Sequence, residues 1–282
     1  MRRARVLFVA IVALAACSTT PPRATRTPSA TPTAESAGLD ATFVVMGDWG
    51  AGTSAQASIA DRMCTVHQRS PFHVVVTTGD NFYNPDGGAT GTNFFEPERC
   101  LIDLGVQWRA SWGNHDAGSS STGSSLGAAH HYRWSLGGID LFALDSNDAS
   151  GAEQRAWLRT ALSSSTARAK IVYFHHPPFT AGLHAPNAGV RAYWVPLFER
   201  YHVTLVLSGH NHDYEHLVEH GIDYVVTGGG GANVYPCLRA AEGLKRCSAE
   251  HHFLLVTARG DRLEVRAIRA EGSTLDRFTI AV

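Results

Sequence analysis

The chain has 282 residues, enough for one or two domains. Hydrophobic residues make up 44% of it and charged residues 17%, which is the composition of an ordinary globular protein with a substantial core. The formal net charge is −1, and no long basic run follows the N-terminus, so the chain lacks the electrostatic footprint of a nucleic-acid-binding protein.

Residues 1–16 have the pattern of an export signal. Three arginines precede a short apolar run at 6–16, which is too short to cross a bilayer by itself. Residues 14–17 resemble a bacterial lipobox, which predicts that Cys17 is lipidated and becomes the first mature residue; the alternative is ordinary secretion with Cys17 as a bystander. Residues 17–40, rich in Pro, Thr and Ser, predict a disordered tether, and one folded domain is expected over 41–282.

Apolar runs and helical patterns alternate along that domain. Short apolar runs that end at Gly-Asp or Gly-Asn pairs predict buried strands, and the Gly-Gly pair at 137–138 predicts a hairpin turn. Strands are predicted at residues 42–46, 72–78, 106–112, 131–136, 139–144, 170–174, 203–207, 222–227, 253–258, 263–270 and 277–282, and helices at 54–69, 151–163 and 193–201. Alternating strands and helices followed by a run of strands predict a layered α/β domain.

Two glycine-rich stretches have simpler interpretations than ligand binding. Residues 118–127 predict a flexible loop near the mouth of a site. The four glycines at 228–231 lack the Lys and Ser/Thr of a phosphate-binding loop, so a strand end or tight turn is expected there.

Five short blocks contain most of the candidate metal ligands. They are GDWG at 47–50, GDNFY at 79–83, GNHD at 113–116, YFHH at 173–176 and GHNH at 209–212. The candidate ligands within them are Asp48, Asp80, Tyr83, Asn114, His175, His210 and His212. Oxygen and nitrogen donors without a thiolate suit a hydrolytic centre of Fe, Mn or Zn. Singly, each residue also has a structural explanation, such as a helix-capping Asp or a packed loop His, but the full set in order favours a metal centre.

The five blocks in this order resemble those of calcineurin-like metallophosphoesterases. The Tyr of GDNFY is similar to that of the purple acid phosphatases, and the blocks look closest to the small tartrate-resistant type. The resemblance implies a four-layer α/β/β/α sandwich with two mixed sheets flanked by helices. It implies Fe³⁺ at Asp48, Asp80, Tyr83 and His212, and a divalent Fe, Zn or Mn ion at Asp80, Asn114, His175 and His210, with Asp80 bridging.

The same resemblance implies an acid phosphatase, in which a metal-bound hydroxide attacks phosphate monoesters, and the signal pattern at 1–16 implies that this enzyme is exported. His115 is expected to face the substrate and Asp116 to orient it, while His184, nine residues beyond His175, matches a second active-site His by spacing. His176 departs from the purple pattern, and the HHPP sequence occurs in related phosphodiesterases. The alternative is therefore a phosphodiesterase acting on nucleotide, lipid or polymer substrates with the same metals.

Further expectations concern the class of function and the binding partners. A non-catalytic surface protein that binds phosphorylated ligands is a different class, which the complete ligand set disfavours. We expect a phosphorylated small molecule as substrate and no nucleic acid. A monomer is expected, with membrane contact only through the N-terminal lipid.

The remaining cysteines form an even set that suits an exported protein. Cys64, Cys100, Cys237 and Cys247 allow three connectivities. Cys237 and Cys247 bracket a polar loop and are the simplest partners, which leaves Cys64 with Cys100. The alternative is buried free thiols.

Overall fold

The computed structural model describes residues 38–117 and 126–282, all within one compact unit, Ala37–Val282. The predicted signal at 1–16, most of the tether and most of the glycine-rich loop at 118–127 lie outside the described residues. The predicted tether ends too late, because the first strand, β1 (Leu39–Met46), includes its last two residues. Leu39 is buried in the core, and the backbone N–H of Asp40 donates to Gly137 O at 3.0 Å.

The first sheet has six strands in the order β13-β12-β11-β1-β2-β3. Its strands after β1 are β2 (Val74–Thr77), β3 (Gln107–Ala110), β11 (His252–Gly260), β12 (Arg262–Arg269) and β13 (Thr274–Ala281). The strands β1, β2 and β3 are parallel, whereas β11, β12 and β13 add antiparallel pairs, so the sheet is mixed.

The second sheet has seven strands in the order β10-β8-β9-β7-β6-β5-β4. They are β4 (Tyr132–Leu136), β5 (Ile139–Ala143), β6 (Ala169–Tyr173), β7 (Leu205–Ser208), β8 (Tyr214–Glu219), β9 (Ile222–Thr227) and β10 (Leu244–Ser248). The strands β5, β6, β7 and β9 are parallel, and β4, β8 and β10 pair antiparallel at or near the edges. This sheet is also mixed.

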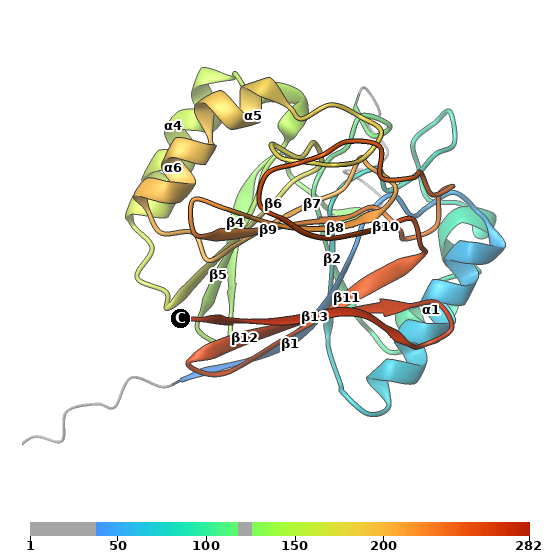
Figure 1. The fold of residues 1–282 in the computed structure, drawn as a ribbon. Coiled ribbons are helices and arrows are strands. Elements are labelled where there is room, and N and C mark those ends of the chain that lie inside the picture. Colours follow the sequence, from blue (N-terminus) through green and yellow to red (C-terminus); the bar gives the residue numbers. More distant parts are fainter. Residues whose placement is uncertain (1–37, 118–125) are drawn as a thin grey trace, which may run out of the picture. The chain divides into compact units, whose positions relative to one another are not determined.

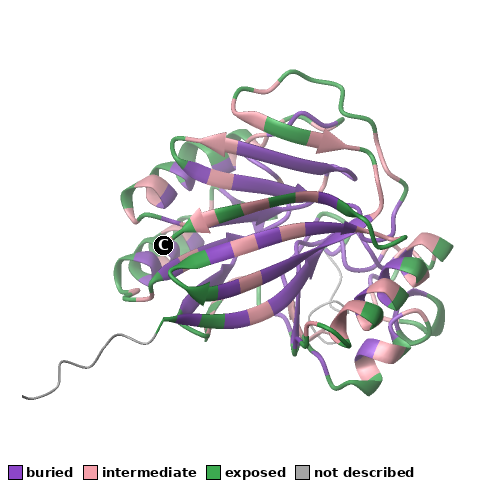
Figure 2. Cartoon of the chain, turned by 60° about the horizontal axis from the view of Figure 1, so that its bottom comes forward, coloured by how far each residue is buried: buried purple, intermediate pink, exposed green. Residues whose placement is uncertain are grey.

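The two sheets pack face to face with helices on their outer faces (Figure 1). The helical elements are α1 (Ser54–His67), η1 (Gly91–Phe95), α2 (Arg99–Asp103), η2 (Ser146–Asp148), α4 (Ala152–Ser163), α5 (Ala188–Tyr193) and α6 (Val195–Arg200). One apolar cluster joins the two sheets, a second lies between the second sheet and α4, α5 and α6, and a third lies between the first sheet and α1. Figure 2 shows buried inner strands, with partly exposed edge strands and exposed outer helix faces. The predicted four-layer sandwich is confirmed.

Most predicted elements are present, some with shifted ends, and a few elements were not predicted. The helix predicted at 193–201 corresponds to α6, which has Pro196 near its N-terminus, and α5 directly before it was not predicted. The strands β8 and β10 were not predicted; β8 follows the GHNH block directly. The first helix begins as predicted, since the Thr53 hydroxyl caps it by accepting the Gln56 N–H at 3.1 Å.

Both predicted disulfides are confirmed. Cys64–Cys100 joins α1 to α2 with Cα atoms 6.4 Å apart. Cys237–Cys247 joins the segment after β9 to β10, with Cα atoms 6.3 Å apart. Across residues 38–117 and 126–282, no helix combines the length and the apolar character that crossing a membrane requires.

Candidate metal centre

The five blocks follow strands whose carboxyl ends meet at one place. Asp48 follows β1, Asp80 follows β2 and Asn114 follows β3, all in the first sheet. His175 follows β6 and His210 follows β7 in the second sheet. The site therefore lies where both sheets present the ends of parallel strands, the usual place for sites in α/β folds.

Three of these residues have left-handed backbone conformations. The φ angles of Asp48, Asp80 and His210 are 56°, 47° and 69°. Such values are uncommon for residues other than Gly and cost of order 1–3 kcal/mol each. Each residue comes directly after a glycine at a strand end, so the chain turns sharply there and the side chain points to the site rather than along the strand.

One group of donors surrounds the Tyr83 hydroxyl. Its oxygen lies 3.0 Å from His212 Nε2, 3.3 Å from Asp48 Oδ1 and 3.4 Å from Asp80 Oδ2. His212 Nε2 is itself 3.2 Å from Asp48 Oδ1. These four side chains are close enough to share one cation.

A second group surrounds His175. Its Nε2 lies 3.0 Å from Asn114 Oδ1 and 3.3 Å from Asp80 Oδ2, and its ring centroid is 5.0 Å from that of His210. Asp80 contacts both groups. Ligand atoms of Asp48, Asp80 and His175 all lie within 4.8 Å of one another. The donor set therefore fits two cations with Asp80 between them.

Backbone carbonyls fix the orientation of two of the imidazoles. His175 Nδ1 lies 3.0 Å from Thr78 O, and His212 Nδ1 lies 2.8 Å from Asn233 O. A carbonyl only accepts, so both Nδ1 atoms must carry the proton. The Nε2 atoms that face the carboxylates are then free to bind a metal, an arrangement common among metal-binding histidines.

The centre concentrates buried negative charge. Burial raises the pKa of Asp48. Burial alone would also raise the pKa of Asp80, but His175 and its hydrogen bonds lower it well below the usual range. Burial opposes the charge of His175, yet Asp80 and Asp48 raise its pKa to about 9. Buried carboxylates need a compensating charge, which bound cations would supply.

The Tyr83 hydroxyl resists ionisation. Burial, and then the charges of Asp48 and Asp80, raise its pKa far above that of free tyrosine. A phenolate at this position would therefore need a strongly Lewis-acidic cation beside it. The donor chemistry fits a trivalent ion better than a divalent ion alone.

The predicted substrate-facing histidines lie at the rim. His115 is exposed; its backbone N–H donates to Asp80 Oδ1 at 2.9 Å, and its ring centroid is 4.5 Å from that of Tyr83. His184 is half-buried, with its ring 4.3 Å from that of His210. The structure thus brings both histidines beside the candidate ligands, on opposite groups.

Asp116 is buried behind the rim. Its carboxylate accepts the N–H of Gly113 at 2.8 Å, the N–H of Asn81 at 3.1 Å and the Asn81 side-chain amide at 2.9 Å. These bonds tie the loop that carries Asn114 to the loop that carries Asp80. The predicted role of Asp116 in orienting His115 stays a prediction.

Two further aromatic side chains lie beside the site. The Tyr235 ring stacks on His212 with centroids 4.3 Å apart and lies 5.7 Å from His184. The His176 ring is 4.5 Å from His210, and its Nδ1 lies 2.8 Å from Ser146 Oγ. The HHPP sequence drew attention to His176, but Tyr235 lies outside every block, so no spacing identified it.

Comparisons with known proteins show the family of the chain. The family profile described as calcineurin-like phosphoesterase matches residues 41–214. The chain is 28% identical to purple acid phosphatase 7 of Arabidopsis thaliana over 233 residues, covering 68% of this chain and 70% of that protein. It is 25% identical to tartrate-resistant acid phosphatase type 5 of Oryctolagus cuniculus over 245 residues, covering 71% of this chain and 75% of that protein.

Solved structures share the fold at low sequence identity. The purple acid phosphatase PPD1 from yellow lupin (Lupinus luteus) has a TM-score of 0.71 at 16% identity, covering 86% of this chain and 53% of that one. GAP50, the anchor in the inner membrane complex of Plasmodium, has a TM-score of 0.73 at 15% identity, covering 86% and 89%. At these identities the similarity concerns the fold alone.

Proposed function

Because the chain belongs to the calcineurin-like phosphoesterase family, we propose that it is a dinuclear acid phosphatase that hydrolyses phosphate monoesters. The chain is a metal-dependent phosphoric ester hydrolase, as its purple acid phosphatase relatives are. The observation that carries the finer proposal is the Tyr83 hydroxyl, which lies 3.0–3.4 Å from His212, Asp48 and Asp80.

Two groups of side chains would hold the metals. We assign Fe³⁺ to Asp48, Asp80, Tyr83 and His212, and a divalent Fe, Zn or Mn ion to Asp80, Asn114, His175 and His210. When bound, such a pair of cations lowers the pKa of a water molecule and neutralises the phosphoryl charge during in-line attack. The buried carboxylates would hold the pair in place, and the carbonyls of Thr78 and Asn233 orient the two imidazoles.

The rim histidines would act on the substrate. His115 is anchored by its backbone N–H to Asp80, so its exposed side chain is free to meet the ester. His115, with His184 across the site, would donate a proton to the leaving oxygen or stabilise charge on it. Asp116 would keep the two loops beneath His115 together.

A phosphodiesterase with the same centre is the second candidate. The observation that favours it is His176, whose ring lies between Ser146 and His210 at the divalent group. A side chain at this position can contact a second ester group of a diester substrate.

Turnover of a monoester against a diester separates these functions. Protein loaded with iron and zinc is assayed with p-nitrophenyl phosphate and bis-p-nitrophenyl phosphate at mildly acidic pH, with Asp80→Ala as the metal-site control. We expect a higher kcat/KM for the monoester. A higher value for the diester would assign the alternative, and no turnover of either substrate by metal-loaded protein would overturn both.

We also propose that the protein is exported and anchored by lipidated Cys17. The two disulfides fit an oxidising compartment outside the cytoplasm. The expected substrate is then an extracytoplasmic phosphorylated small molecule, acted on by a monomer that contacts the membrane only through its lipid. A Cys17→Ala variant expressed in a bacterial host should move from the membrane fraction to the soluble fraction; retention in the membrane fraction would contradict the anchor.

A further inference from the structure

A segment far from the five blocks supports the first group of candidate ligands. This segment, residues 233–239, follows β9 and runs past the centre. The His212 Nδ1–H donates to Asn233 O at 2.8 Å, and the Tyr235 N–H donates to His212 O at 2.8 Å. The Tyr235 ring also stacks on the His212 ring. His212 is therefore held by the 233–239 segment through its ring and its backbone.

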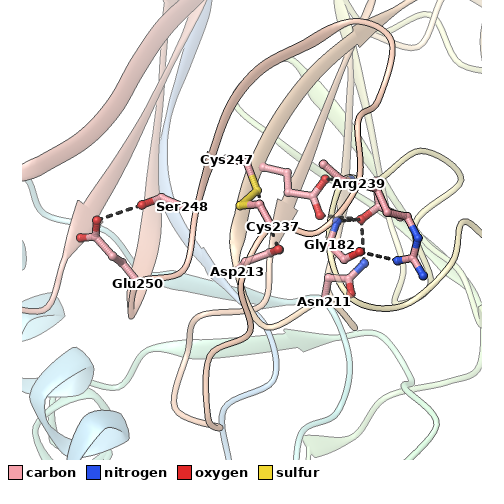
Figure 3. Close-up of a disulfide and its surroundings, with 11 residues drawn as sticks. Gly182, Asn211, Asp213, Cys237, Arg239, Cys247, Ser248 and Glu250 are labelled. Carbon is pink, nitrogen blue, oxygen red and sulfur yellow. Dashed lines mark hydrogen bonds between the residues drawn. A yellow bond between two sulfur atoms is a disulfide. The ribbon is translucent and has the colours of Figure 1, made fainter.

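The far end of the same segment binds the loop that carries His184. The N–H groups of Leu238 and Arg239 both donate to Ala181 O, at 2.9 and 2.8 Å. The Arg239 guanidinium donates through Nη1 to Gly182 O and to Leu183 O, the latter at 2.5 Å. Figure 3 shows this guanidinium beside Gly182. Three consecutive carbonyls before His184 thus accept from one segment.

The inner side of the His184 loop is held by buried side chains. Glu215 of β8 accepts the Thr180 hydroxyl and the Ala181 N–H, each at 2.5 Å. Asn211, inside the GHNH block, accepts the His184 N–H at 2.7 Å. These contacts fix the base of the loop, whereas the outer carbonyls of Gly182 and Leu183 depend on Arg239.

A disulfide fixes the end of the segment that carries Arg239. Cys237 is bonded to Cys247 in β10, and Cys247 lies opposite Glu215 in the β10–β8 register. The covalent link therefore attaches Arg239, two residues beyond Cys237, to the same sheet edge that holds the inner side of the loop (Figure 3). Both supports of the loop, Glu215 and the disulfide-linked Arg239, are therefore attached to the paired strands β8 and β10.

We propose that Arg239, fastened by the Cys237–Cys247 disulfide, is a positioning residue that holds His184 against the divalent-metal side of the centre. The inference rests on the proposed function, because His184 matters only if it faces a substrate. Arg239 itself is exposed, and so is Leu183, one of its two acceptor residues, so losing the arginine should loosen the surface end of the loop without unfolding the domain. Both bonds come from Nη1, whose two N–H groups lie in the rigid guanidinium plane; Lys keeps the charge without that geometry, and Gln is shorter and neutral.

The first test is a mutant cycle with His184. Metal-loaded Arg239→Gln, His184→Ala and the double variant are compared in kcat and KM, with Arg239→Lys as a partial rescue. The net free energy of one hydrogen bond corresponds to about a fivefold change in rate. If the displaced loop costs the transition state that much, Arg239→Gln should lower kcat about fivefold with little change in KM, and Arg239→Lys should recover part of that loss. The double variant should match His184→Ala within about twofold. Multiplicative losses would mean that Arg239 does not act through His184 and would overturn the proposal.

Arg62→Gln is the matched control. Arg62 also donates to two backbone carbonyls, Ala270 O at 3.0 Å and Glu271 O at 2.9 Å, in the turn between β12 and β13. Removing that pair of bonds should leave kcat unchanged. An equal loss in Arg62→Gln and Arg239→Gln would reduce the effect to general destabilisation and overturn the proposal.

Amide hydrogen exchange gives a readout that does not depend on activity. The Gly182 N–H donates to Thr180 Oγ1 and the His184 N–H donates to Asn211 Oδ1, so both amides report the position of the loop. Arg239→Gln should raise exchange at these two amides and leave exchange in β8 unchanged. If wild-type protein hydrolyses no phosphate ester, the proposed function fails while exchange still tests the positioning role. Unchanged exchange at Gly182 and His184 would overturn that role.

Discussion

His115 is attached to the centre by its backbone, which leaves its side chain available for chemistry. The N–H donates to Asp80, and the ring packs beside Tyr83 at the surface. We expect His115→Ala to retain both metals and to lower kcat on alkyl phosphates by roughly 10²–10⁴, the usual range for a positioned general acid. Activated aryl esters should lose less, because their leaving groups need little proton assistance.

Metal analysis and two substrates decide the role of His115. Equal losses on alkyl and aryl esters, with metals retained, would mean that His115 stabilises the phosphoryl group rather than the leaving oxygen. Loss of metal in the variant would make it a structural residue of the centre, which would contradict the proposed role.

Tyr83 should give the iron-loaded protein a visible colour. Its hydroxyl lies between the three other donors of the first group, so a phenolate there would bind Fe³⁺ directly. Charge transfer from phenolate to iron absorbs visible light, and Tyr83→Phe should bleach the band without displacing all the iron. A colourless wild-type protein with stoichiometric iron would show that Tyr83 is not a ligand.

Outside the metal centre, Glu98 makes the stability of the protein depend on pH. Its side chain is 1% exposed, and Oε1 accepts from Gln56 Nε2 at 3.2 Å. Burial raises its pKa from 4.5 to about 8. The unfolded chain therefore loses this proton at lower pH than the folded protein does, and the stability from this group falls as pH rises from about 5 to 8, by up to about 1.4 kcal/mol per pH unit.

Substitution of Glu98 isolates that contribution. Glu98→Gln cannot ionise, so its free energy of unfolding should lack this slope, and its advantage over wild type should grow between pH 5 and pH 8. Urea unfolding at several pH values measures the difference. Parallel pH profiles for the two proteins would show that Glu98 does not carry the proton in the folded state.

At the scale of the elements, the sharp turns after the strands need glycine for close approach. A Cβ on Gly113 would overlap the Asp80 carboxylate and backbone nitrogen, and a Cβ on Gly209 would overlap Asp48 Oδ2. Gly113 thus makes room for a carboxylate presented by the neighbouring strand β2, and Gly209 for one presented by β1 of the other sheet. In the Gly-Asp and Gly-Asn pairs, the second residue is a candidate ligand and the glycine allows close packing at the strand end.

Gly113→Ala should therefore weaken metal binding rather than folding alone. The new methyl group displaces Asp80, which belongs to both donor groups, so we expect sub-stoichiometric metal by elemental analysis. Gly91→Ala is the matched control, because its Cβ would meet only the end of the Glu96 side chain at 3.2 Å. Full metal content in Gly113→Ala would show that the turn relaxes without moving Asp80.

The elements that sequence could predict are those with a strong local signal. Apolar runs before the Gly-Asp pairs identified β1 and β2, because parallel strands in this fold are buried on both faces. The strand β8, of sequence YEHLVE, has no regular alternation of apolar and polar residues, and its polar residues Glu215 and His216 are buried, so its hydrophobic pattern is weak. Those side chains are satisfied by hydrogen bonds to Thr180 and Asp223, which the sequence of the strand itself does not predict.

For the molecule as a whole, the candidate ligands could be predicted from local sequence, whereas the contacts that support them could not. The seven candidate ligands lie within short blocks at strand ends, so the sequence predicted that they would converge. The support from the 233–239 segment consists mainly of backbone hydrogen bonds, ring stacking and one arginine. Such contacts depend on where the chain returns after β9, and no local pattern encodes that path.

The two disulfides should contribute differently, Cys64–Cys100 more to stability and Cys237–Cys247 more to catalysis. Cys64–Cys100 spans 36 residues and Cys237–Cys247 spans 10. Loop-closure entropy then makes the longer link more stabilising by about 1 kcal/mol. A Cys64→Ser/Cys100→Ser variant should lose more unfolding free energy in urea, yet keep its kcat once folded and loaded with metal.

The variant Cys237→Ser/Cys247→Ser should show the opposite order. It should be destabilised less, but its kcat should fall about as far as that of Arg239→Gln, because the anchor of the 233–239 segment is lost. Adding Arg239→Gln to it should then change kcat little, since both changes release the same loop. If the Cys64/Cys100 variant instead lost the larger share of kcat, activity would follow global stability, and the segment would have no separate part in holding the site.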